Sequence, residues 1–198
     1  MDKILVIGSY NVGLTVFGAA IPQAGETILG SRFDMGPGGK GSNQAICVAR
    51  LGGDVTFLAK IGDDIFGKDA MALFNRECIN TDYIRVDGSA HTGAGIIFVD
   101  KNCHNAIGVA PGANYNLSVD DIDAAAGLFK QSGYLLMQME IFTGRPGLME
   151  SKAGHCTLME LMIMWRCRIM TRYGFRKMIL PRRYGYILKE MLTILQMN

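Results

Sequence analysis

Short apolar runs alternate with helical segments along most of this chain. Three runs have the length and the continuous apolar character of buried β-strands, namely residues 3–8, 54–61 and 133–139. Three segments are predicted to be helices, namely residues 42–51, 66–78 and 119–130. Gly52 and Gly53 would stop the first helix, and Ser118 is placed to cap the third.

This alternation of strands and helices predicts a parallel sheet that is covered on both faces. A short strand is expected at residues 83–86. The remaining strand-like runs are more mixed, which suits partly exposed strands, and they are residues 11–18, 27–35, 95–100 and 104–109. We expect these mixed strands to form a small separate sheet over a ligand site, because ligands of such α/β folds collect at the carboxyl ends of the parallel strands.

The glycine-rich run at residues 36–45 is the strongest candidate for that site. Glycine is unfavourable inside a helix or strand, but it lets the backbone approach a ligand closely, with N–H groups exposed at a helix start. Lys40 adds a cation, and Asn43 adds a side chain that both donates and accepts hydrogen bonds. Asn11 and Glu140 also follow predicted strands, so they are expected to meet this run at one edge of the sheet.

The run from Gly38 to Ala45, together with the later Gly52 and Gly62, resembles the N-terminal signature of ribokinase-like carbohydrate kinases, the PfkB family. The likeness extends over residues 3–141, through segments that lie in the order the family has them: Gly8-Ser9-Tyr10-Asn11, Gly25-Glu26-Thr27, Gly62-Asp63-Asp64, Thr92-Gly93, Gly112-Ala113-Asn114 and Leu136-Met137-Gln138-Met139-Glu140. The resemblance implies a three-layer α/β core with a β-sheet lid. It also implies a kinase that uses ATP and Mg²⁺ to phosphorylate a hydroxyl of ribose, deoxyribose or a related sugar.

By the family pattern, the sugar would be held by Asn11, Gly39, Lys40, Asn43 and Glu140, with Gly41 and Ser42 in the same turn. Sugar hydroxyls donate and accept, so amide, ammonium and carboxylate groups can fix one orientation. The family usually has an acidic residue where this chain has Gly13. Loss of a charged hydrogen-bond partner costs roughly 1.5–3 kcal/mol, which points to weaker binding or to a different sugar. The family also implies closure of the lid over the sugar and a homodimer formed through the lid.

The composition changes sharply after Ile141. Residues 1–141 hold 10 Lys and Arg against 15 Asp and Glu, whereas residues 142–198 hold 10 against 3, within a net charge of +2. The family likeness stops at the same point. We interpret residues 142–198, with possible helices at 158–169 and 186–197, as the product of a shifted reading frame. A basic interaction module and a divergent replacement for the missing half of the kinase are the alternatives.

The sequence contains neither the Gly-Ala-Gly-Asp loop that carries the family's catalytic aspartate nor its Asn-Pro segment. We therefore expect no catalytic residue in this chain and little or no kinase activity, because phosphoryl transfer depends on positioning and charge stabilisation. A non-catalytic sugar-binding protein or a fragment without function is the alternative. A dinucleotide-binding oxidoreductase is also considered, since Gly36-x-Gly38-x-x-Gly41 matches that fingerprint.

Other classes of partner receive little support from the sequence. The five cysteines form no Cys-x-x-Cys pair, so we expect reduced thiols in a cytoplasmic protein. The three histidines show no metal-ligand spacing, so we expect no structural metal. No stretch approaches the roughly 20 apolar residues of a membrane span. The expected partner is a small sugar, with neither a nucleic acid nor a membrane.

Overall fold

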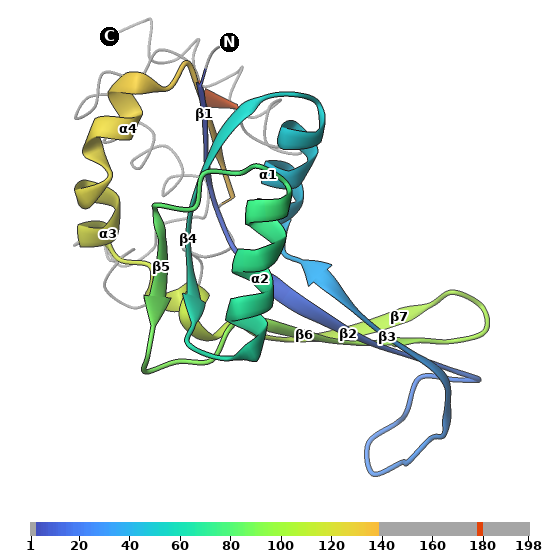
Figure 1. The fold of residues 1–198 in the computed structure, drawn as a ribbon. Helices are drawn as coiled ribbons and strands as arrows, with labels where there is room; N and C mark the ends of the chain where they lie inside the picture. The colour runs from blue at the N-terminus through green and yellow to red at the C-terminus, as the bar shows by residue number, and fades with distance from the viewer. Residues whose placement is uncertain (1–2, 139–177, 180–198) are drawn as a thin grey trace, which may run out of the picture.

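The computed structural model describes residues 3–138 and 178–179, which form a three-layer α/β core with a long, narrow sheet that extends away from it (Figure 1). The predictions for Glu140, for the helices at 158–169 and 186–197, and for residues 142–198 as a separate segment lie outside the described residues, except for the short strand at 178–179.

The core sheet has five parallel strands in the order β5-β4-β1-β8-β9. Their bounds are β1 Lys3–Ile7, β4 Asp54–Gly62, β5 Ile84–Asp87, β8 Tyr134–Met137 and β9 Met178–Ile179. The central strand β1 pairs with β4 on one side and with β8 on the other, so residues 3–7 are covered along both edges. The parallel sheet predicted from the alternation of strands and helices is confirmed.

Helices cover both faces of this sheet, as predicted. On one face, α1 (Lys40–Arg50) and α2 (Ile65–Arg76) pack on a cluster that contains Val6, Phe57 and Phe74. On the other, α3 (Val119–Ala124) and α4 (Ala126–Gln131) pack on a cluster that contains Leu5 and Leu135. Neighbouring residues of β1 therefore pack in the clusters on opposite faces of the sheet, because successive side chains of a strand point to opposite faces.

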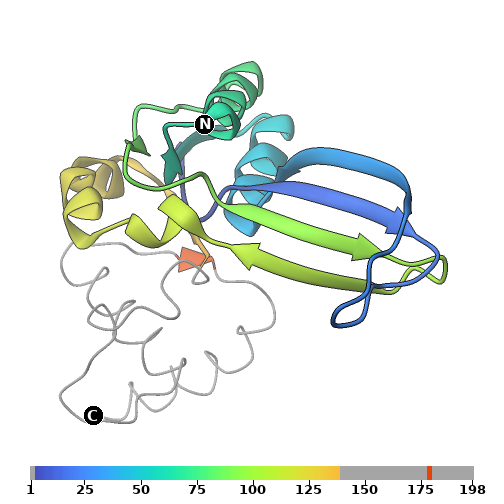
Figure 2. The ribbon, with the colours of Figure 1, turned by 90° about the horizontal axis from the view of Figure 1, so that it is seen from below.

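The second sheet is the small separate sheet that the mixed strands predicted. Its order is β3-β2-β6-β7, and Figure 2 shows its four strands extending side by side from the core. The bounds are β2 Asn11–Gly18, β3 Gly30–Gly38, β6 Ala94–Val99 and β7 Asn105–Ala110. We call this sheet the lid. Strands β2 and β6 are parallel, and each also pairs with an antiparallel neighbour.

Several predicted boundaries differ from the structure; the strand predicted at 27–35, for example, spans Gly30–Gly38. The glycine-rich run is not one loop: Gly36 to Gly38 end β3, Lys40 begins α1, and Gly39 alone lies between them. The predicted helix over 119–130 is interrupted at Ala125, which separates α3 from α4. The Ser118 cap is confirmed as a capping box with Asp121.

Candidate functional site

The passage from β3 of the lid into α1 is built on close backbone contacts that require glycine. Gly39 has φ +94°, and a Cβ there would lie 2.6 Å from the Ser9 carbonyl oxygen and 3.0 Å from the Asn11 nitrogen. A Cβ on Gly41 would lie 2.6 Å from Cα of Gly8. The end of β1 and the start of α1 can therefore touch only where neither side carries a side chain.

Ser42 stabilises this turn through its hydrogen bonds. Its side chain is wholly buried, and its hydroxyl donates to the carbonyl oxygens of Gly38 at 2.5 Å and of Gly39 at 3.0 Å. Its backbone N–H donates to the Ser9 carbonyl oxygen at 3.1 Å. These contacts assign Gly41 and Ser42 to shaping the turn, whereas Lys40 and Asn43 are exposed on the same first helical turn.

Asn11 and Gly13 lie on one face of the lid beside this turn. Asn11 is paired with Gly38, and Gly13 with Gly36 on β3 and with Gly95 on β6. A Cβ added to Gly13 would lie 3.5 Å from the Gly36 oxygen, an ordinary contact, so the backbone would accept a larger residue there. The structure thus brings Asn11, Gly13 and Gly39 together at the base of the lid, next to the start of α1.

Glu140 lies outside the described residues, but the strand that leads to it ends at the same place. The Gln138 N–H donates to the Ile7 carbonyl oxygen at 2.9 Å, which continues the pairing of β8 with β1. A Cβ on Gly8 would lie 3.2 Å from Cβ of Gln138. The carboxyl ends of β1 and β8 therefore flank the first turn of α1.

Asn114 belongs to this site, although the sequence analysis named it only within the Gly112-Ala113-Asn114 segment of the family likeness. It lies in the short helix η1 (Gly112–Asn116), and its side chain is 2% exposed. Its Nδ2 lies 2.7 Å from the Tyr10 carbonyl oxygen and 3.0 Å from Oδ1 of Asn11, and its Oδ1 accepts from the Tyr10 N–H. The only signal in the sequence was the Gly-Ala-Asn segment, which gave no indication of a partner 103 residues away.

Asp64 and Thr92 fasten the start of β6 to the core. Asp64 caps α2 by accepting from the Gly67 N–H at 2.8 Å, and it also accepts from the N–H and the hydroxyl of Thr92, each at 2.7 Å. Partial burial opposes ionisation of Asp64, but these hydrogen bonds outweigh it and lower the pKa of the carboxyl group. Burial raises the pKa of the adjacent Tyr10, and the charges of Asp69 and Asp64 add to that effect.

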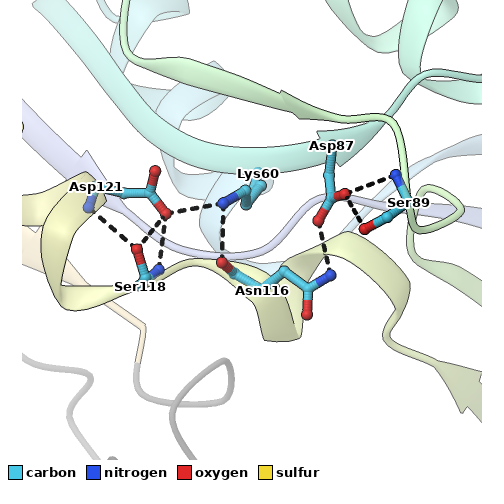
Figure 3. Close-up of polar contacts among 6 residues, drawn as sticks. All are labelled: Lys60, Asp87, Ser89, Asn116, Ser118 and Asp121. Atoms are coloured by element: carbon cyan, nitrogen blue, oxygen red, sulfur yellow. Dashed lines mark hydrogen bonds and ion pairs between the residues drawn. The ribbon is translucent and has the colours of Figure 1, made fainter.

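A second polar cluster holds η1 and α3 against the core sheet (Figure 3). The Lys60 ammonium group on β4 donates to the Asn116 carbonyl oxygen and to Oδ2 of Asp121, each at 2.9 Å. Asn116 in turn donates to Asp87, at 2.7 Å. Hydrogen bonds from Ser89 and then from Asn116 lower the pKa of Asp87 to about 2. This cluster fixes the helix that carries Asn114.

Within residues 3–138 and 178–179, no group of three or more His, Cys, Asp or Glu side chains is arranged to hold a metal ion. None of the helices in that part of the chain is long and apolar enough to cross a bilayer. The dinucleotide fingerprint is not supported either, because Gly36 and Gly38 lie in the lid strand β3, whereas that fingerprint requires a turn out of a core strand.

The fold and this site define a class of protein that comparison with known proteins confirms. The profile of the pfkB family carbohydrate kinases matches residues 1–157, and the chain belongs to this family. A deoxyribokinase of Salmonella typhi is 39% identical over 138 residues, which are 70% of this chain and 45% of the relative.

Solved structures agree with this assignment. The ribokinase of Giardia lamblia superimposes with a TM-score of 0.71 and 26% identity, covering 92% of this chain and 51% of that one. The ribokinase of Arabidopsis thaliana, solved in complex with ribose and ATP, gives a TM-score of 0.67 and 26% identity over 90% of this chain and 53% of that one. The expected ribokinase-like fold is confirmed, and the chain spans about half the length of these relatives.

Proposed function

We propose that residues 3–138 form the sugar-binding part of an ATP-dependent sugar kinase. The observation that carries this proposal is the meeting of Asn11, Gly39 and the first turn of α1 at the base of the lid, in a chain of the pfkB family. Lys40 and Asn43 are exposed there, so both can reach a ligand that lies between lid and core. Glu140 is proposed to complete the set of groups around the sugar.

The chemistry of these groups suits a polyol. An ammonium group and two carboxamides supply donors, and a carboxylate supplies acceptors, so several hydroxyl groups can be fixed at once. The lid carries Asn11 and Gly13 at its base and would exclude water, which otherwise competes with the sugar as phosphoryl acceptor. When bound, ATP and Mg²⁺ would supply the phosphoryl group and neutralise its charge.

The sugar is proposed to be ribose, deoxyribose or a close relative. Gly13 offers no side chain to hold a hydroxyl group, whereas an aspartate would fit there without a backbone clash. We expect Gly13→Asp to improve binding of D-ribose by about tenfold, the effect of one charged hydrogen bond. An unchanged affinity would mean that the sugar hydroxyls do not approach this strand.

We propose that the 198-residue chain transfers little phosphate by itself, because its sequence has no Gly-x-Gly-Asp loop to supply a general base. Binding of a sugar without turnover is the second candidate function. The exposed free thiols Cys47, Cys78 and Cys103 suit the reducing cytoplasm that we propose as its location.

The test combines thermal unfolding of the full chain with an assay for ADP. D-Ribose or 2-deoxy-D-ribose is expected to raise the unfolding temperature, with no sugar-dependent ADP formed from Mg-ATP. Asn43→Ala should abolish the sugar response and leave the unliganded protein unchanged, since the side chain is exposed. Asn105→Ala, exposed on β7, is the control. Absence of any sugar response would refute the sugar site, and sugar-dependent ADP would refute the proposed inactivity.

We also propose that the chain forms a homodimer through the lid. The face of the lid opposite Asn11 and Gly13 carries two apolar cross-strand rows, one through Met35, Leu14 and Ile96 and the other through Phe33, Val16 and Phe98. Phe33 and Met35 are 60% and 56% exposed. A second copy offers the same rows in return, as a two-fold interface requires, and apolar rows in contact would leave water.

A further inference from the structure

The direction of the Asn114 carboxamide is fixed by backbone groups whose roles cannot be exchanged. The Tyr10 N–H can only donate, and it faces Oδ1 of Asn114 at 3.0 Å. The carbonyl oxygens of Tyr10 and Pro111 can only accept, and they face Nδ2 at 2.7 and 3.0 Å. The nitrogen end of Asn114 must therefore point to the two carbonyl groups and the oxygen end to the N–H.

The orientation of the Asn114 carboxamide determines the orientation of the Asn11 carboxamide. Nδ2 of Asn114 lies 3.0 Å from the side chain of Asn11, and since an amide nitrogen only donates, the atom of Asn11 that faces it is Oδ1. The N–H₂ group of Asn11 is then directed away from Asn114. The buried asparagine thereby decides that Asn11 presents donors, and not an acceptor, at the base of the lid.

Gly93 leaves the space in which this contact is made. A Cβ on Gly93 would overlap both Oδ1 of Asn11 and Nδ2 of Asn114, and it would lie 2.8 Å from the Tyr10 carbonyl oxygen. The two carboxamides therefore meet directly over the Cα of Gly93. Only glycine leaves the space for this meeting, although its own backbone conformation does not require glycine.

The helix that carries Asn114 is held from both sides. Gly112 has φ +50°, and a Cβ there would overlap His91, whose carbonyl oxygen accepts from the Ala113 N–H at 2.8 Å. At the far end, Asn116 is held by Lys60 and Asp87, as Figure 3 shows. These contacts restrict rotation of the Asn114 side chain, so its carboxamide is preorganised before any ligand binds.

We propose that Asn114 is a positioning residue that sets the polarity of Asn11, so that Asn11 donates hydrogen bonds to a hydroxyl oxygen of the bound sugar. This inference rests on the proposed sugar site and deepens it. It predicts discrimination by hydrogen-bond polarity: the ligand atom next to Asn11 must be an acceptor.

The first test needs no ligand. In the full chain labelled with ¹⁵N-asparagine, the Asn114 side-chain amide protons should exchange with solvent at least about 100-fold more slowly than those of exposed Asn102, because a buried hydrogen-bonded group exchanges only on opening. A nuclear Overhauser effect should join Gly93 Hα to the Asn114 amide protons and be absent or much weaker for those of Asn11. The reverse pattern, or fast exchange at Asn114, would overturn the proposal.

The second test measures D-ribose affinity by calorimetry. Asn11→Asp keeps an acceptor for Asn114 but loses both donors, so it should retain its unfolding temperature within a few degrees and bind about tenfold more weakly. Asn114→Asp and Gly93→Ala should weaken binding at least as much. The controls are the charge-matched Asn105→Asp and the size-matched Gly108→Ala, which should leave binding unchanged. A Cβ on Gly108 meets nothing within 4 Å.

The two tests separate the two proposals. If the unaltered chain does not bind ribose or deoxyribose, the sugar site is refuted, and the Overhauser pattern still decides the polarity of Asn11. If the chain binds and Asn11→Asp binds equally well, the positioning role is refuted while the sugar site stands.

Discussion

Cys78 shows how a single backbone angle affects stability. It follows the C-cap of α2 and has φ +56°, a region in which residues other than glycine are strained. We expect Cys78→Gly to increase the free energy of unfolding by about 0.5–1 kcal/mol, measured by urea denaturation. Cys47→Gly, the same change inside α1, should instead lower it by about 1 kcal/mol. Equal effects of the two changes would contradict this account.

Asp87, also at the residue scale, makes a pH-dependent contribution to the free energy of unfolding. Its pKa is lowered to about 2 by Ser89 and Asn116, below the value of the unfolded chain. The stability that its charge provides is therefore fully present above pH 4 and is lost as the pH falls toward 2. The difference in unfolding temperature between the unaltered chain and Asp87→Asn should shrink over that interval. Asp82→Asn, which replaces an exposed carboxylate before β5, is the control.

At the scale of the element, the start of α1 depends on one hydroxyl group. Ser42 is wholly buried and its hydroxyl donates to the Gly38 carbonyl oxygen, so Ser42→Ala removes this hydrogen bond from the turn, while the Gly39 carbonyl oxygen keeps the Asn43 N–H as a donor. We expect a loss of about 0.5–1.5 kcal/mol in the free energy of unfolding. Ser31→Ala removes a hydroxyl that also donates to a carbonyl oxygen, that of Phe17, but at an exposed position, and should change stability by less than about 0.5 kcal/mol.

Elements are also the scale at which sequence and structure agree best. Runs such as 54–61 and 133–139 are apolar enough to predict buried strands, because burial on both faces imposes that composition locally. The predictions of one continuous helix over 119–130 and of a helix that begins at residue 42 were wrong in detail, since helix ends depend on tertiary contacts: the structure has a break at Ala125 and begins α1 at Lys40. The role of Asn114 was missed because its partners, Tyr10 and Asn11, lie over 100 residues away, and no local pattern encodes such a contact.

At the scale of the whole molecule, the lid is attached to the core at one end and otherwise extends away from it (Figure 2). One face of such a sheet is directed toward the site. The opposite face is exposed to solvent unless a partner covers it. The apolar rows through Phe33 and Met35 therefore argue for a second copy, since isolated sheets with one exposed apolar face are prone to association.

Met35→Lys tests this association directly. A charge within the apolar rows would be repeated on the partner and lose its hydration on contact, which costs several kcal/mol in a buried position. The unaltered chain is expected to show the mass of a dimer at micromolar concentration by analytical ultracentrifugation, and Met35→Lys that of a monomer. Leu29→Lys, in the loop between β2 and β3 and 93% exposed, should remain dimeric. If Met35→Lys is dimeric as well, the two copies do not associate through this face. A monomer in all three cases would mean that the apolar rows face solvent or a different partner.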